Sequence, residues 1–153
     1  MMQKIVPFLW FDKPVKEVVD FYSTVFKDNI QLIEKQGTEG DGAFMSATVN
    51  IYGQEFILFN AGPFKPFSPA TSFFINCQTQ EEVDYLWENL GAGGAKQCGW
   101  IDDKFGVTWQ IIPVQLGKLL GDPDRVKANR VMQAMMKMSK IIIADLEKAY
   151  NGE

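Results

Sequence analysis

The sequence contains no histidine, and this absence excludes several kinds of chemistry at once. Imidazole is the usual general base near neutral pH, the usual partner of a nucleophilic serine or cysteine, and a common metal ligand. Most catalytic triads and most catalytic zinc sites are therefore ruled out. Any chemistry has to come from carboxylates, lysine, tyrosine, cysteine or a cofactor.

Cysteine is scarce as well. Cys77 and Cys98 are the only two, and they lack the Cys-x-x-Cys spacing of redox and zinc motifs. Two cysteines are also too few for a disulfide scaffold. Cys98 could be a reactive thiol or an inert packing residue. No imidazole can activate it, and free cysteines inside proteins are usually unreactive. We therefore expect Cys98 to be inert.

The chain has neither an excess of basic residues nor a long apolar run. Its formal net charge is −4 and its pI is about 4.9, so no positive field attracts phosphates. No apolar stretch approaches the roughly 18 residues that a membrane helix requires, and the first residues do not have the layout of a signal peptide. We expect a cytoplasmic protein that binds neither nucleic acid nor membranes.

The 153 residues suffice for one hydrophobic core and fall short of two full-sized domains. Within this length the sequence pattern predicts the same series of elements twice. Residues 3–11 read as a strand and 15–26 as an amphipathic helix, with Asp12 placed to cap it and Pro14 in its first turn. The other predicted elements are strands at 30–35, 43–51 and 54–60, a proline-rich linker at 61–69, a strand at 70–78, a helix at 79–90 and a hairpin at 98–113.

Residue matches support an internal repeat. Val-Asp followed by an aromatic residue occurs at 19–21 and again at 83–85, an offset of 64 residues, and residues 52–58 resemble residues 105–111. The predicted fold is therefore α+β, with two tandem β-α-β-β-β repeats followed by C-terminal helices. A single duplication of this length differs from a solenoid, which needs more copies.

The C-terminal part changes pattern after Pro113. Residues 115–120 form a short predicted helix, Gly121 ends it, and Asp122-Pro123 is placed to cap a second helix that runs to Tyr150 with a break near Ser139. Four of the seven methionines lie within residues 132–138. Such a flexible thioether face suits contact with a partner subunit or packing onto the sheet, and both interpretations stay open.

The hairpin predicts the location of a site. Side chains alternate along a strand, so Trp109 and Ile111 point to one side while Thr108 and Gln110 point to the other. Polar groups are costly to bury without partners, so the second side is the candidate site. In the strand at 70–78 the corresponding residues are Ser72, Phe74 and Asn76. The acidic residues Glu55, Asp102 and Asp103 lie near strand ends, where we expect them to be solvated.

A family resemblance rests on motifs that span nearly the whole chain. They are Leu9-Trp10-Phe11-Asp12, Asp20-Phe21-Tyr22, Ala61-Gly62-Pro63, Glu82-Val83-Asp84, Cys98-Gly99-Trp100, Asp103-Lys104-Phe105-Gly106-Val107, Trp109-Gln110-Ile111 and Pro113. With them the chain resembles the PhnB-like branch of the vicinal-oxygen-chelate superfamily, which includes glyoxalase I, bleomycin-resistance proteins and extradiol dioxygenases. This branch is often labelled 3-demethylubiquinone-9 3-methyltransferase. The segments 138–141 and 146–150 also look like the family's tail.

The resemblance implies a superfamily domain over residues 1–114, made of repeats 1–61 and 70–114, and a helical extension over 115–153. It implies two sheets curled into a cup, in a homodimer. Metal-dependent members hold a divalent ion at positions that correspond here to Pro7, Ile57 or Leu58, Ser72 and Gln110. An amide and a hydroxyl are too few ligands for such an ion, so we expect neither a metal nor another cofactor.

The resulting functional prediction is a metal-free cup that binds a small organic ligand. The predicted ligand-binding residues are Ser72, Phe74, Asn76, Trp100, Thr108 and Gln110. In the alternative interpretation of the polar residues, Gln110 and Asn76 only form hydrogen bonds across neighbouring strands. The alternative function is a metal-dependent lyase, isomerase or transferase of the same superfamily, with catalytic residues unassigned. Methyl transfer is disfavoured, because the chain lacks a glycine-rich turn between a first strand and a helix.

Overall fold

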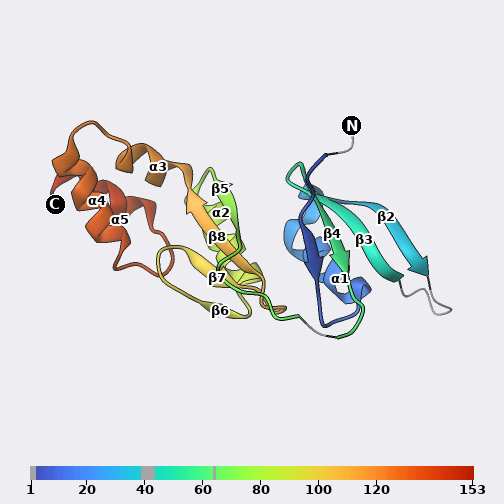
Figure 1. Cartoon of the computed structure of the whole chain (residues 1–153). Helices are drawn as coiled ribbons and strands as arrows, with labels where there is room; N and C mark the ends of the chain where they lie inside the picture. Colours follow the sequence, from blue (N-terminus) through green and yellow to red (C-terminus); the bar gives the residue numbers. More distant parts are fainter. Residues whose placement is uncertain (1–2, 39–43, 64) are drawn as a thin grey trace. The chain divides into compact units, whose positions relative to one another are not determined.

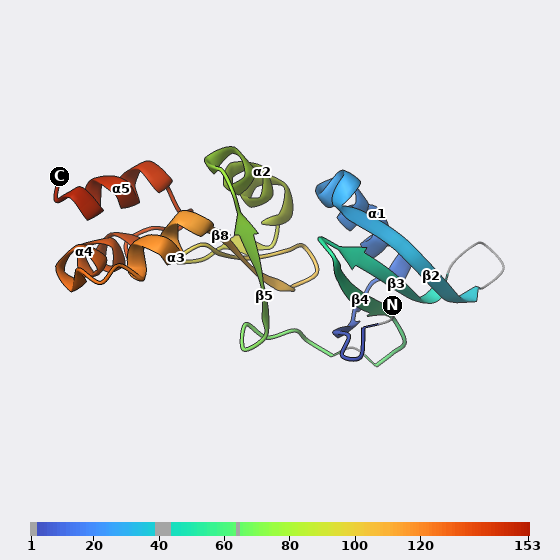
Figure 2. The ribbon, with the colours of Figure 1, turned by 90° about the horizontal axis from the view of Figure 1, so that it is seen from above.

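The computed structural model describes residues 3–38, 44–63 and 65–153. The chain divides into two compact units, Met1–Pro66 and Phe67–Glu153. Each unit contains a four-stranded mixed sheet with a helix against one face, as Figures 1 and 2 show. Residue 43 of the predicted third strand and residue 64 of the predicted linker lie outside the described residues.

The first unit has the strand order β1-β4-β3-β2, in which β1 is parallel to β4 and the other pairs are antiparallel. Its elements are β1 (Phe8–Trp10), α1 (Val15–Phe26), the 3-10 helix η1 (Lys27–Asn29), β2 (Ile30–Thr38), β3 (Phe44–Ile51) and β4 (Gln54–Phe59). Apolar residues of α1 spaced three and four apart are buried against the sheet, including Val18 and Tyr22, which have no exposed surface.

The second unit repeats this arrangement with the order β5-β8-β7-β6, and β5 is parallel to β8. Its sheet and helix are β5 (Ser72–Cys77), α2 (Gln80–Leu90), β6 (Gly94–Ala95), β7 (Trp100–Asp102) and β8 (Thr108–Pro113). The shared strand order confirms the predicted α+β fold with duplicated β-α-β-β-β units. A cup requires both sheets together, so that part of the expectation stays a prediction.

Two local predictions about the first unit differ from the structure. The first strand was expected over residues 3–11 but covers only Phe8–Trp10. Pro7 has no N–H to donate, although its carbonyl still accepts a hydrogen bond from the Ile57 amide at 2.9 Å. Asp12 was expected to cap α1, but the N-cap residue is Pro14 and no side chain caps this end.

The C-terminal helices α3 (Val114–Leu120), α4 (Arg125–Met135) and α5 (Ile143–Asn151) belong to the second unit. They share a core cluster made of Ile112, Leu116, Val131, Ile141 and Leu146. The cap predicted at Asp122-Pro123 is instead Asp124, whose carboxylate accepts from the backbone N–H groups of the first turn. No helix in the described residues is long and apolar enough to span a membrane.

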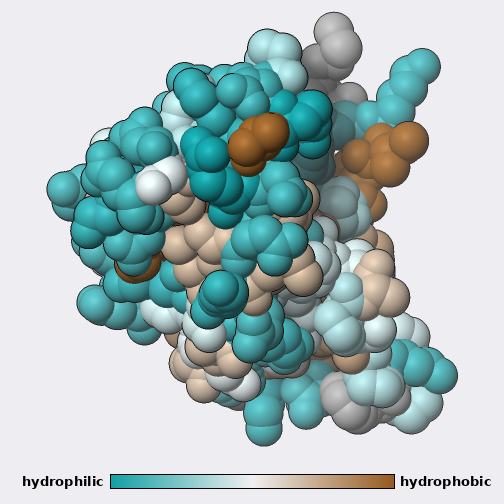
Figure 3. Space-filling view, turned by 90° about the vertical axis from the view of Figure 1, so that its left-hand side faces the viewer, coloured by the Kyte–Doolittle hydropathy of each residue, from teal (hydrophilic) through white to brown (hydrophobic). Residues whose placement is uncertain are grey.

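The methionines divide between packing and exposure. Met135 and Met138 pack against the core cluster, whereas Met132 and Met136 remain 38% and 56% exposed. Packing within the chain is therefore confirmed for two of the four. The surface on the side of α4 and α5 mixes hydrophilic residues with scattered hydrophobic ones (Figure 3).

Backbone hydrogen bonds attach the segment between α4 and α5 to the start of β7. The Cys98 amide donates to the Met138 carbonyl at 2.8 Å, and the Gly99 amide donates to the Ser139 carbonyl at 2.7 Å. Gly99 has a φ of +83°, and a Cβ placed there would lie 2.7 Å from Ile112 Cδ1. Both the backbone conformation and the close packing therefore require glycine at this position.

Candidate ligand-binding site

The central strand of the second sheet, β8, brings predicted site residues together. Gln110 pairs with Phe74 of β5 on one side and with Trp100 of β7 on the other. Cross-strand partners project from the same face of a sheet, so these three side chains are neighbours. We call the face that carries Ser72, Phe74, Asn76, Trp100, Thr108 and Gln110 the open face.

The opposite face forms the core of the unit. Trp109 and Ile111 are buried there, and α2 contributes Val83, Leu86 and Leu90, none of which has exposed surface. The predicted alternation along β8 is thus confirmed. Since α2 covers only this side, Phe74 on the open face keeps 53% of its surface exposed.

A cavity of about 310 Å³ lies on the open face. The sheet side contributes Phe74, Trp100, Gln110 and Ile112, together with Cys98, and the C-terminal helices contribute Leu116, Gly117, Leu120 and Met135. This volume is at the lower end of the range for small-molecule pockets, and a mainly apolar lining with few polar groups is typical of them. The cavity is open to one side and has room for a small organic molecule.

Gln110 supplies the only side-chain amide of the cavity lining. Its Nε2 donates to Ser72 Oγ at 2.9 Å, which is the cross-strand hydrogen bond considered as the alternative role. That bond uses one amide N–H and leaves the carbonyl oxygen Oε1 available as an acceptor. Ser72 accepts in this bond, so its own hydroxyl proton also remains available. The structural hydrogen bond therefore orients Gln110 without saturating it.

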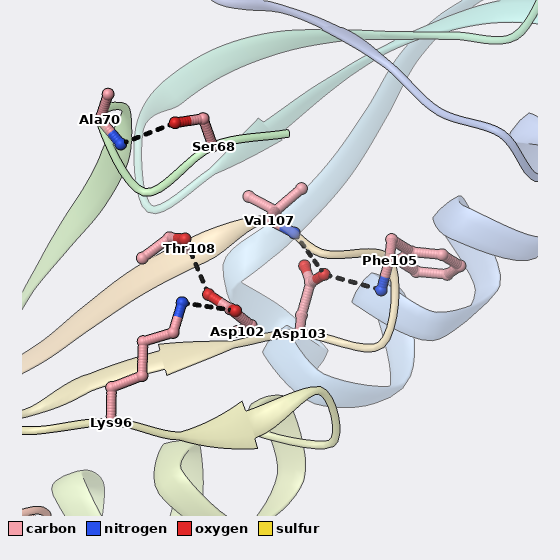
Figure 4. A network of polar contacts seen from close by, with 8 residues as sticks. All are labelled: Ser68, Ala70, Lys96, Asp102, Asp103, Phe105, Val107 and Thr108. Carbon is pink, nitrogen blue, oxygen red and sulfur yellow. Dashed lines mark hydrogen bonds and ion pairs between the residues drawn. The ribbon is translucent and has the colours of Figure 1, made fainter. Parts of the chain in front are cut away.

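Thr108 and Asn76 share the open face but are not part of the cavity lining. Thr108 is 1% exposed, and its hydroxyl donates to Asp102 Oδ1 at 2.7 Å. Lys96 Nζ forms an ion pair with Asp102 Oδ2 at 2.5 Å, and Figure 4 shows this ion pair beside the hydrogen bond from Thr108. Asn76 is exposed. Of the six predicted ligand-binding residues, the cavity lining therefore includes Phe74, Trp100 and Gln110.

Asp103 is buried, contrary to the expectation of a solvated turn acid. It is 1% exposed, and its Oδ1 accepts from the backbone amides of Phe105 and Val107 at 2.9 and 3.0 Å (Figure 4). Its Oδ2 accepts from Trp109 Nε1 at 3.0 Å. These bonds satisfy the carboxylate inside the protein and fix the turn that joins β7 to β8.

The contribution of α3 and α4 to the cavity was missed from the sequence. Leu116, Leu120 and Met135 were assigned to helices, but nothing in their spacing indicates that these helices meet the open face. One signal was present: α3 follows Pro113, the last residue of β8, without an intervening loop. A helix that begins where a strand ends has to lie near that end of the sheet.

The first sheet has its own hollow of about 430 Å³. It is lined by Gln3, Val6, Ile33, Glu34, Gln36, Thr48, Glu55 and Ile57. Ile57 occupies the place in β4 that Gln110 occupies in β8, since it pairs with Phe8 as Gln110 pairs with Phe74. The duplicated position is therefore hydrocarbon in one unit and amide in the other.

The four positions that correspond to the superfamily's metal ligands do not fit a metal ion. Pro7 and Ile57 (or Leu58) have no donor side-chain atoms, and Ser72 and Gln110 are hydrogen-bonded to each other. Zinc and the hard divalent cations require more oxygen, nitrogen or sulfur ligands than this. Among residues 3–38, 44–63 and 65–153, no three His, Cys, Asp or Glu side chains are grouped so that they could hold a metal.

Two β-α-β-β-β units with the same strand order define a vicinal-oxygen-chelate fold. A family model described as 3-demethylubiquinone-9 3-methyltransferase matches residues 3–112, and the chain belongs to this family. A PhnB protein from Bacillus cereus is similar to this chain with 29% identity and a TM-score of 0.64, and the match covers 73% of this chain and 100% of that one.

More distant structures show the fold alone. Protein PA1353 from Pseudomonas aeruginosa has 18% identity and a TM-score of 0.59, over 73% of this chain and 98% of that one. The fosfomycin resistance protein FosX from Listeria monocytogenes has 16% identity and a TM-score of 0.55, over 80% of this chain and 99% of that one. A search of curated proteins finds no match.

The family match ends at residue 112, before the first of the C-terminal helices begins. The four cavity residues contributed by α3 and α4 therefore lie outside the residues that the family model matches. The cavity combines a family sheet with walls from the segment that follows it.

Proposed function

We propose that the protein binds a small organic molecule in the cavity on the open face of the second sheet, and that it does so without a metal ion. The observation that carries this proposal is the placement of Gln110 between Phe74 and Trp100 in the cavity lining. Aromatic walls provide affinity, and a single amide provides orientation. Ser72 acts through its hydrogen bond to Gln110, as a positioning residue.

The test is a titration of the isotope-labelled full chain with a panel of aromatic fragments, followed by NMR. Saturable shifts of the Trp100 indole N–H and the Gln110 side-chain amide are expected. Gln110→Leu should lower the affinity for the tightest-binding fragment about tenfold, because the substitution removes a hydrogen bond inside the cavity. Asn76→Ala is the matched control, since Asn76 lies on the same face outside the lining. The proposal fails if no fragment shifts these signals, or if both variants behave alike.

Metal-free binding is tested separately by native mass spectrometry after incubation with Zn²⁺, Ni²⁺ or Mn²⁺. The proposal predicts no stoichiometric retention, because the corresponding positions lack ligands. Retention of one ion per chain would instead support the metal-dependent lyase, isomerase or transferase of the alternative interpretation. That result would require ligands other than Ser72 and Gln110.

The family description names a methyl transfer, and we propose that it does not describe the activity of this chain. The glycines at 91–94 follow α2 and lead into β6, so they do not open a helix that could receive a cofactor. Calorimetry with S-adenosylmethionine should show no binding at micromolar concentration. Binding in that range would overturn this part of the proposal.

We also propose a homodimer, as the family resemblance implies. The support for this proposal is the family itself, whose model matches residues 3–112, together with the duplicated fold. Light scattering should give twice the mass of the chain. A monomer at all concentrations would contradict the proposal.

A further inference from the structure

We infer that Gly117 is a specificity-determining residue, and that the cavity which it lines takes a flat, uncharged aromatic compound. This inference rests on the proposed function and adds the class of ligand. It depends on three features of the second unit: an unexplained glycine inside a helix, a cavity lining without formal charge, and two aromatic side chains beside one amide.

Neither conformation nor packing explains the glycine at position 117. It lies in the middle of α3 (Val114–Leu120), where alanine would be a better helix former. Its φ is not in the left-handed region, and a Cβ built there meets no atom within 4 Å. Gly99 differs, because both its φ and its neighbours demand glycine. At Gly117 the absent side chain leaves the helix backbone exposed at the cavity.

A ligand can therefore approach the backbone of α3 closely, which is a recognised use of glycine. A larger residue at this position would extend into unoccupied space without disturbing the helix. The size of the side chain at position 117 thus limits the ligand directly. Leu116 and Leu120 flank Gly117 on the same helix and keep the surroundings apolar.

The chemistry of the lining disfavours a charged ligand. Cys98 is its only residue that can ionise, and the thiol donates to the Met135 carbonyl at 3.7 Å. Lys96 and Asp102 form an ion pair with each other, and neither residue lines the cavity. An anion or cation in the cavity would find no counter-charge among the lining residues, and moving an unpaired charge even partly out of water is costly.

The remaining groups specify the ligand more closely. Phe74 and Trp100 line the cavity with aromatic rings, which favour an aromatic partner, and the thioether of Met135 adds a polarisable contact. Gln110 Oε1 accepts a hydrogen bond, so the ligand should carry a hydroxyl or N–H donor. A neutral aromatic alcohol, phenol or amide meets all of these conditions.

The test uses two probes that share a ring system and differ in charge at pH 7. Titration of the full-length protein with 2-naphthol should shift the Trp100 indole signal, and 2-naphthoate should bind at least about tenfold more weakly. Gly117→Leu should lower the affinity for 2-naphthol at least about tenfold, because a leucine side chain at this lining position would take up space that the ligand needs. Lys118→Leu is the matched control, because Lys118 is an exposed residue next to Gly117 on α3 and does not line the cavity, so this variant should retain the binding. Both variants should fold at least as stably as the wild type.

Each outcome decides a separate claim. Equal affinities for the two probes, or undiminished binding of 2-naphthol by Gly117→Leu, would overturn the inference while leaving the proposed function intact. The comparison of the two probes needs only the wild-type protein, so it tests the preference for an uncharged ligand even if a variant does not fold. If neither these probes nor the fragment panel shifts the Trp100 signal, the proposed function fails, and the inference fails with it.

Discussion

Replacing Asp103 by alanine is expected to destabilise the second unit strongly, although Asp103 lies in a turn. The carboxylate is 1% exposed and accepts hydrogen bonds from the amides of Phe105 and Val107 and from Trp109 Nε1. Alanine would remove the acceptor of these three hydrogen bonds in a place that water does not reach. An unsatisfied buried group costs about 1–3 kcal/mol, and such costs are not additive within a network. A loss of about 3–5 kcal/mol in the free energy of unfolding is therefore expected.

Asp103→Asn separates the contributions of the two oxygens. The asparagine carbonyl can keep both backbone hydrogen bonds, but its NH₂ group then faces the indole N–H of Trp109, donor against donor. The expected loss is about 1–3 kcal/mol. In a Trp109→Phe background this conflict disappears, so the same substitution should cost less than about 1 kcal/mol. The packing defect that Trp109→Phe creates cancels in the double-mutant cycle.

Urea unfolding followed by circular dichroism measures all four proteins of the cycle. Glu147→Gln is the control, because Glu147 is an exposed acid on α5 and its substitution should change stability by less than about 0.5 kcal/mol. The reasoning is refuted if Asp103→Ala costs less than about 1 kcal/mol. It is also refuted if Asp103→Asn costs the same with tryptophan and with phenylalanine at position 109.

Three further predictions concern other parts of the second unit. Gln80 donates to the Ile141 carbonyl at 3.1 Å and accepts from the Ile143 amide at 2.8 Å, so Gln80→Ala should cost about 1–2 kcal/mol in urea unfolding and accelerate hydrogen exchange at Ile143. The hydrogen bond from Tyr150 lowers the pKa of Asp122. The lowered pKa stabilises the folded state above the pKa that this carboxyl has in the unfolded chain, and the stabilisation is lost as the pH falls through the pKa in the folded state. Tyr150→Phe should therefore make the midpoint of urea unfolding less sensitive to acid. Burial raises the pKa of the Cys77 thiol to about 12, so in a Cys98→Ser variant iodoacetamide at pH 8 should modify Cys77 only after denaturation, and modification of the native protein would contradict this.

Local patterns predicted the elements whose signals lie within a few residues. The spacing of apolar side chains gave both ends of α1 as Val15 and Phe26, since the buried face of a helix repeats every three to four residues. Helix caps were predicted less well. Asp122 and Asp124 both flank Pro123, but Asp124 caps α4. The Asp122 carboxylate accepts instead from the Asp124 amide and from the Tyr150 hydroxyl, 28 residues further along the chain. Such a tertiary contact leaves no trace in local sequence.

The candidate site was predictable to the extent that strand alternation determines it. Phe74, Trp100 and Gln110 line the cavity because the two-residue period and the strand pairing place them together. The adjacent acids Asp102 and Asp103 show the limit of that rule. Asp102 pairs with Lys96 on the open face, while Asp103 turns inward to Trp109. Their residue type is the same, and the direction of the backbone at the turn decides between them.

The comparison between the two units suggests how one chain can use a duplicated fold unequally. Phe8 and Phe74 occupy equivalent places, but their partners in the next strand are Ile57 and Gln110. A hydrocarbon cannot orient a polar ligand, whereas an amide held by Ser72 can. At this pair of positions only the second face therefore carries a hydrogen-bonding group, while the polar groups of the first hollow, such as Gln36 and Thr48, come from other positions. The second face is also the one that the C-terminal helices wall in with Gly117. An orienting group is useful only where a ligand is held, and in this chain both features occur on the same sheet.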